Sequence, residues 1–365
     1  MRGIHTKRNQ DGLAAIIVAT VIMIILSLIT LGFARLMRRE QRQALDRSLS
    51  SQAFYAAESA VNDAVRRIQD EANPYTEDKN GCTQDASTFT GTVDGSLGSS
   101  YTCLLIDQSP STLEYTQGSI STNASKIVPI RADPPNRGSP SAPLGRISIA
   151  WEDPSLNTTA AGLNTTPTFG CPSPVVLPAF TNWNTKTPGM IRLDIIPADA
   201  LDRASLQTQT ASLYLYPADN GCASASSSIA FNNYIGDNKG QIVKVKCSAT
   251  DNTRPRDCEL AIDMDALHQN RLYYVRVRSI YHNSDMTVRI YDTDTPAKQL
   301  PIRGAQVQID ATGKVNDVLR RVQVRVPVTK SYPIPEFVLQ TTDSICKKIE
   351  VAPAPANIAN NSCPL

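Results

Sequence analysis

The chain carries one uncharged run of 23 residues, from Gly12 to Ala34, close to its start. At a rise of about 1.5 Å per residue, such a run forms a helix of about 34 Å, which is enough to cross a hydrocarbon core of about 30 Å. No proline interrupts the run, and after Gly12 at its start Gly32 is the only glycine in it. We therefore expect residues 13–34 to cross a membrane as a helix.

The flanks of the run restrict what kind of membrane segment it is. A cleaved secretory signal has an apolar region of about 7–15 residues followed by a small-residue cleavage site. The present run is longer, and it passes directly into charged sequence, LMRREQRQALDRS. A cleaved signal is therefore disfavoured, whereas a plain signal anchor remains open.

The helix is expected to continue beyond the membrane to Ala72. Asn73-Pro74 should end it, because the residue before a proline disfavours the α conformation. Apolar residues between Leu45 and Ile68 recur at steps of three and four, so one stripe of this half should pack on protein. The stripe consists of Leu45, Leu49, Ala53, Ala56, Ala57, Ala60, Val61, Ala64, Val65 and Ile68. The sequence thus predicts one helix over 13–72, transmembrane over 13–34 and amphipathic over 35–72.

Three segments of the chain resemble type IV pilins. Lys7, Arg8 and a polar stretch end at Gly12, and the apolar run begins at Leu13, as in a prepilin leader. The segment QAFYAAESAVNDAV resembles the signature that closes the N-terminal helix of PilX-type minor pilins, with Ala56, Ala57 and Glu58 as the matching residues. The segment QIDATGKVNDVLRRVQVRVPV (308–328) is similar to the closing hairpin of pilin-like subunits, with its turn expected at Ala-Thr-Gly.

This resemblance implies a minor pilin or pseudopilin. Residues 1–12 would be the leader, which a prepilin peptidase removes after Gly12 before the new terminus at Leu13 is methylated. Cleavage there places Ile17 at the fifth mature position, where major pilins carry a glutamate that pairs with a neighbouring subunit. The departure favours a minor subunit over the bulk filament subunit. The implied partners are other pilin subunits, the peptidase, the inner or cytoplasmic membrane, and a host or neighbouring cell surface.

Charge and cysteine content give opposing indications of orientation. The leader carries Arg2, Lys7 and Arg8, whereas five arginines follow the run, and the usual lysine and arginine bias would place the larger group in the cytoplasm. Long domains, however, translocate largely regardless of flanking charge. All eight cysteines lie after the helix, without a C-x-x-C pair, a pattern that favours disulfides in an oxidising compartment. We therefore expect a cytoplasmic N-terminus and an extracellular bulk.

Eight cysteines allow on the order of 100 pairings. Neighbour pairing is our prediction, because each such bridge closes a loop that contains no other cysteine. The predicted bridges are Cys82 with Cys103, Cys171 with Cys222, Cys247 with Cys258, and Cys346 with Cys363. The alternative is that some of these residues are buried thiols.

The region from 73 to 330 is predicted to be an antiparallel, β-rich, disulfide-stapled domain, so the fold class is α+β and pilin-like. Short period-two runs alternate with turn signals, which suits a sandwich-like module. The runs YYVRVRSI and MTVRIY flank His282-Asn283-Ser284-Asp285 and predict a hairpin. Helical turns are expected at 198–204 and 263–269. The Pro-, Ser- and Thr-rich interval 157–178 is either a sub-boundary between β units or a long surface loop, and 331–365 is a Pro-rich tail.

Catalytic and cofactor motifs are not evident in the sequence. After loss of the leader only His268 and His282 remain as histidines, and no G-x-S-x-G elbow or phosphate-binding glycine loop is present. The pairs Asp263/Asp265 and Asp292/Asp294 are too few for a calcium site and are explained more simply by helix capping and turns. A net charge of +2 does not favour nucleic-acid binding. We expect no enzyme, no cofactor and no metal.

Two functions remain. The first is a minor pilin-like structural subunit of a type IV pilus or related filament, which displays a β domain for assembly initiation, adhesion or surface contact. The alternative is a single-pass membrane-anchored extracellular binding protein that is not incorporated in a filament. In either case, exposed polar loops on the β scaffold would contact the ligand.

Overall fold

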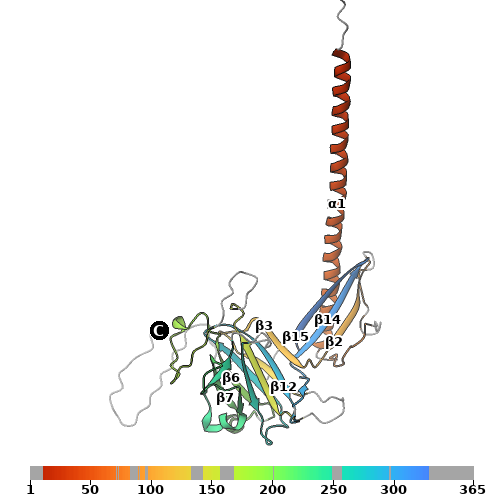
Figure 1. The fold of residues 1–365 in the computed structure, drawn as a ribbon. Helices are drawn as coiled ribbons and strands as arrows, with labels where there is room; N and C mark the ends of the chain where they lie inside the picture. Colours follow the sequence, from red (N-terminus) through yellow and green to blue (C-terminus); the bar gives the residue numbers. More distant parts are fainter. Residues whose placement is uncertain are drawn as a thin grey trace, which may run out of the picture. The chain divides into compact units, whose positions relative to one another are not determined.

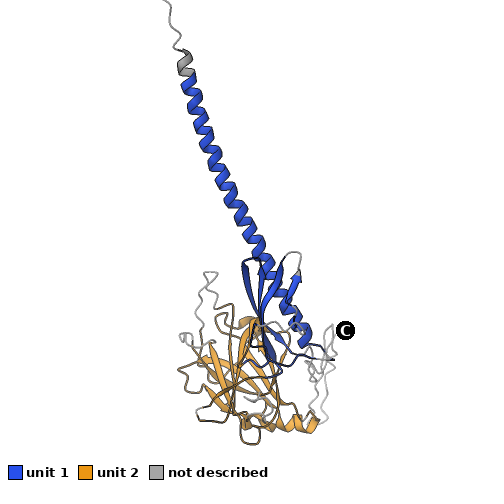
Figure 2. Cartoon of the chain, turned by 90° about the vertical axis from the view of Figure 1, so that its right-hand side faces the viewer, with its two compact units in different colours: residues 1–110, 303–328 blue, residues 111–302, 329–365 orange. Residues whose placement is uncertain are grey.

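A computed structural model describes residues 11–70, 72, 74–82, 89, 91–94, 98–132, 143–156, 168–199, 201–248, 257–295 and 297–328. The described chain divides into two compact units, coloured separately in Figure 2. Unit 1 contains the residues up to Pro110 together with Arg303–Val328, and unit 2 contains Ser111–Ile302. The interval 157–178 therefore falls inside unit 2. Lys7, Arg8 and the tail 331–365, with Cys346 and Cys363, lie outside the described residues.

Unit 1 begins with the 58-residue helix α1, Asp11–Ile68, the long red helix in Figure 1. The helix ends four residues before the predicted Ala72, ahead of the proline. Hydrogen bonds that the sequence pattern does not reveal account for the earlier end. The amide of Tyr75 donates to the Arg67 carbonyl (2.9 Å), and the Asp70 carboxylate accepts from the Ala72 amide (2.9 Å), so the chain turns back at once.

The second half of α1 packs against an antiparallel sheet in the order β1-β2-β14-β15. The strands are β1 (Thr92–Asp94), β2 (Ser99–Asp107), β14 (Gln306–Val315) and β15 (Val318–Pro327). Figure 1 shows the blue β14 and β15 beside the orange β2, although about 200 residues separate them in sequence. The buried cluster between helix and sheet includes Ala57, Ala60, Ala64, Ile68, Tyr101, Leu104, Ile106, Ile309 and Ala311.

The closing hairpin exists, but its turn is not at Ala-Thr-Gly. Ala311, Thr312 and Gly313 are inside β14, and the turn is Asn316-Asp317, with Asn316 at φ 52°. Gly313 instead lies against α1. A Cβ at this position would lie 2.1 Å from the Ala53 carbonyl oxygen and 2.4 Å from the Ala57 amide nitrogen. The glycine is needed for close approach of strand to helix rather than for a turn.

Unit 2 is built on one sheet of eleven strands, together with the short helix α2 (Arg203–Gln209), whose first turn Asp202 caps. Its strands are β3 (Thr112–Ile120), β4 (Lys126–Ile130), β5 (Arg146–Glu152), β6 (Met190–Pro197), β7 (Ala211–Asp219), β8 (Ser228–Ala230), β9 (Gln241–Cys247), β10 (Cys258–Asp263), β11 (Tyr273–Ile280), β12 (Ser284–Tyr291) and β13 (Gln299–Leu300). Most pairs are antiparallel, as expected. The pairs β7 with β9 and β8 with β10 are parallel.

The predicted hairpin between β11 and β12 is wrong. β11 pairs with β4 and β6, whereas β12 pairs with β3, β5 and β13, so these consecutive strands lie near opposite ends of the sheet order. Only three residues, 281–283, connect them, and such a connection spans no more than about 14 Å. The two ends of the sheet are therefore close together. Unit 2 is consequently a nearly closed barrel-like sheet rather than a sandwich.

Candidate functional site

The first half of α1 is the most exposed apolar surface of unit 1. It belongs to the one helix, among the described residues, that is long and apolar enough to cross a membrane. Large apolar side chains from Ile16 to Phe33 are between 47% and 68% exposed. Burial of this surface is strongly favourable, at about 25 cal/mol per Å². The finding supports a single-pass membrane anchor. Gly12 and Leu13 lie in the backbone of α1, so the expected processing site is within the helix.

The Ala-Ala-Glu signature lies where α1 meets the sheet. Ala56 and Ala57 are buried, at 1% and 0% exposure, and both contact the Gly313 backbone region of β14. Glu58 is exposed on the other side of the helix. The expected buried stripe is confirmed from Ala53 to Ile68, but Leu45 is 62% exposed. The two alanines therefore set the helix-to-strand distance, whereas Glu58 makes no contribution to that packing.

Three predicted disulfides are confirmed. Cys82 pairs with Cys103, Cys171 with Cys222, and Cys247 with Cys258. The first links the strand β2 of unit 1 to the segment that follows α1, and the other two lie in unit 2. The predicted pair Cys346 and Cys363 lies outside the described residues. The bridges favour an oxidising, extracytoplasmic location for both units.

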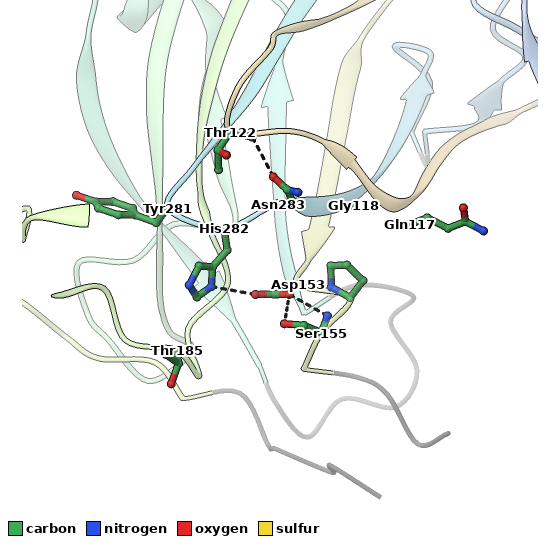
Figure 3. A pocket seen from close by; sticks show the side chains of 10 residues that line it. Gln117, Gly118, Thr122, Asp153, Ser155, Thr185, Tyr281, His282 and Asn283 are labelled. Atoms are coloured by element: carbon green, nitrogen blue, oxygen red, sulfur yellow. Dashed lines mark hydrogen bonds and ion pairs between the residues drawn. The ribbon is translucent and has the colours of Figure 1, made fainter. Parts of the chain in front are cut away.

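Unit 2 has an open polar depression of about 640 Å³ where the ends of the sheet approach each other. Figure 3 shows its lining, which comes from β3 and the segment after it, the end of β5, the 281–283 connection and one loop residue. The lining residues are Gln117, Gly118, Thr122, Asp153, Pro154, Ser155, Thr185, Tyr281, His282 and Asn283. Except for His282 and Asn283, sequence reasoning did not single out these positions. Asp153-Pro154, directly after β5, is a turn signal; it indicates a loop at this position but does not indicate a binding site.

Asp153 organises this depression. The residue is 3% exposed, and its carboxylate accepts hydrogen bonds from the Ser155 amide (2.9 Å) and hydroxyl (2.6 Å), while its other oxygen lies 3.0 Å from Nδ1 of His282. Figure 3 shows Asp153 between Ser155 and His282. In a catalytic triad the histidine lies between serine and acid. Here the acid lies between the serine and the histidine, so the order of the three residues differs from that of a catalytic triad.

Backbone strain concentrates at the same depression. Gln117 and Tyr281 adopt positive φ values of 61° and 77°, and Gly118 adopts 67°. Such conformations are costly for residues with a side chain and persist only where the surroundings impose them. Tyr281 is held by stacking on Trp183 at a centroid distance of 4.0 Å and by its hydroxyl, which donates to the Pro178 carbonyl (3.0 Å). Burial also raises the pKa of Tyr281 above its usual value.

The second histidine and the acidic pairs have structural roles. His268 is 8% exposed and its ring bonds the Asp265 carboxylate, while its carbonyl accepts from the Tyr273 hydroxyl. Asp263 pairs with Arg146 (2.6 Å) as the last residue of β10, so no helix follows for it to cap. Asp292 accepts from the amides of Asp294 and Lys298, which confirms the predicted turn. Among the described residues, no group of three potential ligands is close enough to hold a metal.

The comparison of this chain with family models, curated proteins and solved structures gives no match. The resemblance to type IV pilins therefore rests on the three short segments quoted above.

Proposed function

We propose that this chain is a minor pilin-like structural subunit of a type IV pilus or a related filament. The observation that carries the proposal is the division of one continuous helix into two halves. In α1 the apolar half is uncovered, and the other half packs on a sheet that a C-terminal hairpin completes. Such an apolar half needs lipid or other helices around it. A filament subunit uses both: lipid before assembly and neighbouring helices after it.

The N-terminus would be cytoplasmic before assembly, and both units would be extracellular. Unit 2 would then be the part displayed for assembly initiation, adhesion or surface contact. Its polar depression supports this assignment because Asn283, Gln117 and Thr185 present neutral donors and acceptors beside the fixed His282 ring. Groups of this kind bind neutral polar ligands.

The test is mass spectrometry of the mature N-terminus after purification from native membranes. Cleavage after Gly12 gives a chain that starts at an N-methylated Leu13. A chain that retains residues 1–11 would refute pilin-type processing and leave the single-pass anchored binding protein as the function. A Gly12→Leu variant is the matched control, because it keeps the hydrophobic run and should block the cleavage.

A further inference from the structure

Four arginines form one stripe on α1 immediately beyond its uncharged run. Arg35, Arg38, Arg39 and Arg42 are spaced at i, i+3, i+4 and i+7, so they share one face of the helix. All four side chains are exposed, and together with Gln43 they line a groove of about 280 Å³. Within the described residues, none of the four makes an ion pair. We call this set the arginine stripe.

The position of the stripe matches the polar edge of a bilayer. Residues 12–34 account for the hydrocarbon core, and Arg35 is the first charged residue after it. The stripe extends over eight residues from Arg35 to Arg42, and these seven steps are about 10 Å along the helix axis. Arginine side chains also reach several ångströms from their own helix position toward the interface. The guanidinium groups therefore lie at the depth of lipid phosphates on whichever side the stripe emerges.

The stripe has little nearby compensation for its charge. Glu40 is on the opposite face of α1, as is Arg47, whereas Asp46 shares the face of the stripe but is next to Arg42 alone, one turn farther from the membrane. Four like charges on one helix face repel one another. An anionic ligand would remove that repulsion, and a guanidinium binds a phosphate through two parallel hydrogen bonds.

We propose that the arginine stripe binds the phosphate groups of anionic phospholipids at the surface of the membrane that α1 crosses. The inference rests on the membrane-spanning helix and not on incorporation in a filament. It also accounts for the four arginines of the stripe, although the domain that follows is expected outside the cytoplasm, because bound anionic headgroups offset their charge. Each basic residue near an anionic surface contributes about a fivefold gain in affinity.

The test uses the full chain in detergent, mixed with equal amounts of phosphatidylglycerol and phosphatidylcholine, with bound lipids counted by native mass spectrometry. The unaltered chain should bind phosphatidylglycerol at least tenfold more often. Arg38→Gln with Arg42→Gln should lower that preference severalfold. Arg47→Gln with Arg66→Gln, which removes equal charge off the stripe, should leave it unchanged. Arg38→Lys with Arg42→Lys should retain part of it, because lysine keeps the charge but not the two parallel hydrogen bonds.

Three outcomes would overturn the proposal. The first is equal binding of the two lipids by the unaltered chain, and the second is equal loss in the stripe and off-stripe variants. The third is an unchanged lipid preference with a lower oligomeric mass for the stripe variant, which would assign the stripe to contacts between copies. The variants should fold, because these side chains are exposed, and hydrogen-exchange protection of residues 53–68 in unit 1 checks this directly. The outcome is independent of cleavage after Gly12, so this inference and the proposed function can fail separately.

Discussion

Replacement of Gly313 by alanine is expected to separate α1 from the sheet of unit 1. The added Cβ would lie 2.1 Å from the Ala53 carbonyl oxygen, 2.4 Å from the Ala57 amide nitrogen and 3.0 Å from the Ala56 carbonyl carbon. All three are backbone atoms of a helix, so no flexible side chain is available to move aside. Ordinary contact begins near 3.4 Å, and the strand must therefore retreat by about 1.3 Å.

The cost follows from what this retreat does to the surrounding cluster. A gap of about 0.5–1 Å already removes a quarter to a half of the dispersion attraction between the atoms that it separates. Ala57, Ala60 and Ala64 face Leu104 and Ile309 across this interface. Overpacking of a core costs about 1–3 kcal/mol, and the rigid backbone partners favour the upper end. A loss of about 3 kcal/mol is equivalent to a roughly 100-fold increase in the fraction of unit 1 that is open.

Hydrogen exchange with mass spectrometry on the full chain in detergent measures this opening locally. Amides of residues 53–68 and of β14 should exchange about 100-fold faster in the variant. Both tryptophans, Trp151 and Trp183, lie in unit 2, so their fluorescence during denaturation provides an internal control that should not change. Gly32→Ala is the matched substitution, because a Cβ at that position would have no neighbouring atom within 4 Å. Unchanged protection of β14 in Gly313→Ala would refute the close-approach explanation.

Three further changes test other parts of the structure. Ala57→Lys places a charge at a position with 0% exposure and should cost several kcal/mol, measured as lost hydrogen-exchange protection of the β14 amides. Normal protection of these amides would contradict the assignment of Ala57 to the buried stripe. The Cys171–Cys222 bridge joins residues 51 positions apart, and its removal should lower the unfolding free energy of unit 2 by about 4 kcal/mol in guanidinium titrations. A loss below about 1 kcal/mol would show that the unfolded chain gains little conformational freedom when the bridge is removed. Asp153→Ala removes the hydrogen bonds from the Ser155 amide and hydroxyl and the contact with Nδ1 of His282, and should cost about 1–3 kcal/mol by tryptophan fluorescence. Asp294→Ala at an exposed pair should not move the midpoint, and equal effects would contradict the role given to Asp153.

Local sequence signals predicted most of the individual elements. The helix was recognisable because its first half is uncharged and its second half repeats apolar residues every three or four positions. The period-two runs YYVRVRSI and MTVRIY correspond to β11 and β12, and three neighbour disulfides are present as expected. Four strands were not predicted: β1, β8 and β13 have only two or three residues each, and β3, TLEYTQGSI, alternates poorly and contains a glycine.

The candidate site was largely unpredictable from sequence. Asp153, Thr122 and Tyr281 come from three separated segments, and they meet only because the sheet of unit 2 curls until its ends approach. The hairpin prediction with a turn at 282–285 failed for the same reason. Alternation reports which face of a strand is buried, but it does not report which strand lies beside it.

By itself, the sequence determined the properties that depend on neighbouring residues: a membrane-length apolar helix, its arginine stripe, the alternating strands and the loops closed by cysteines. The tertiary structure alone decided the pairing of β2 with β14, the use of Gly313 as a contact rather than a turn, and the assembly of the depression around Asp153. The physical reason is the range of the interactions. Helix periodicity and turn chemistry act over a few residues, whereas strand partners and close approaches are selected by burial of surfaces that are far apart along the chain.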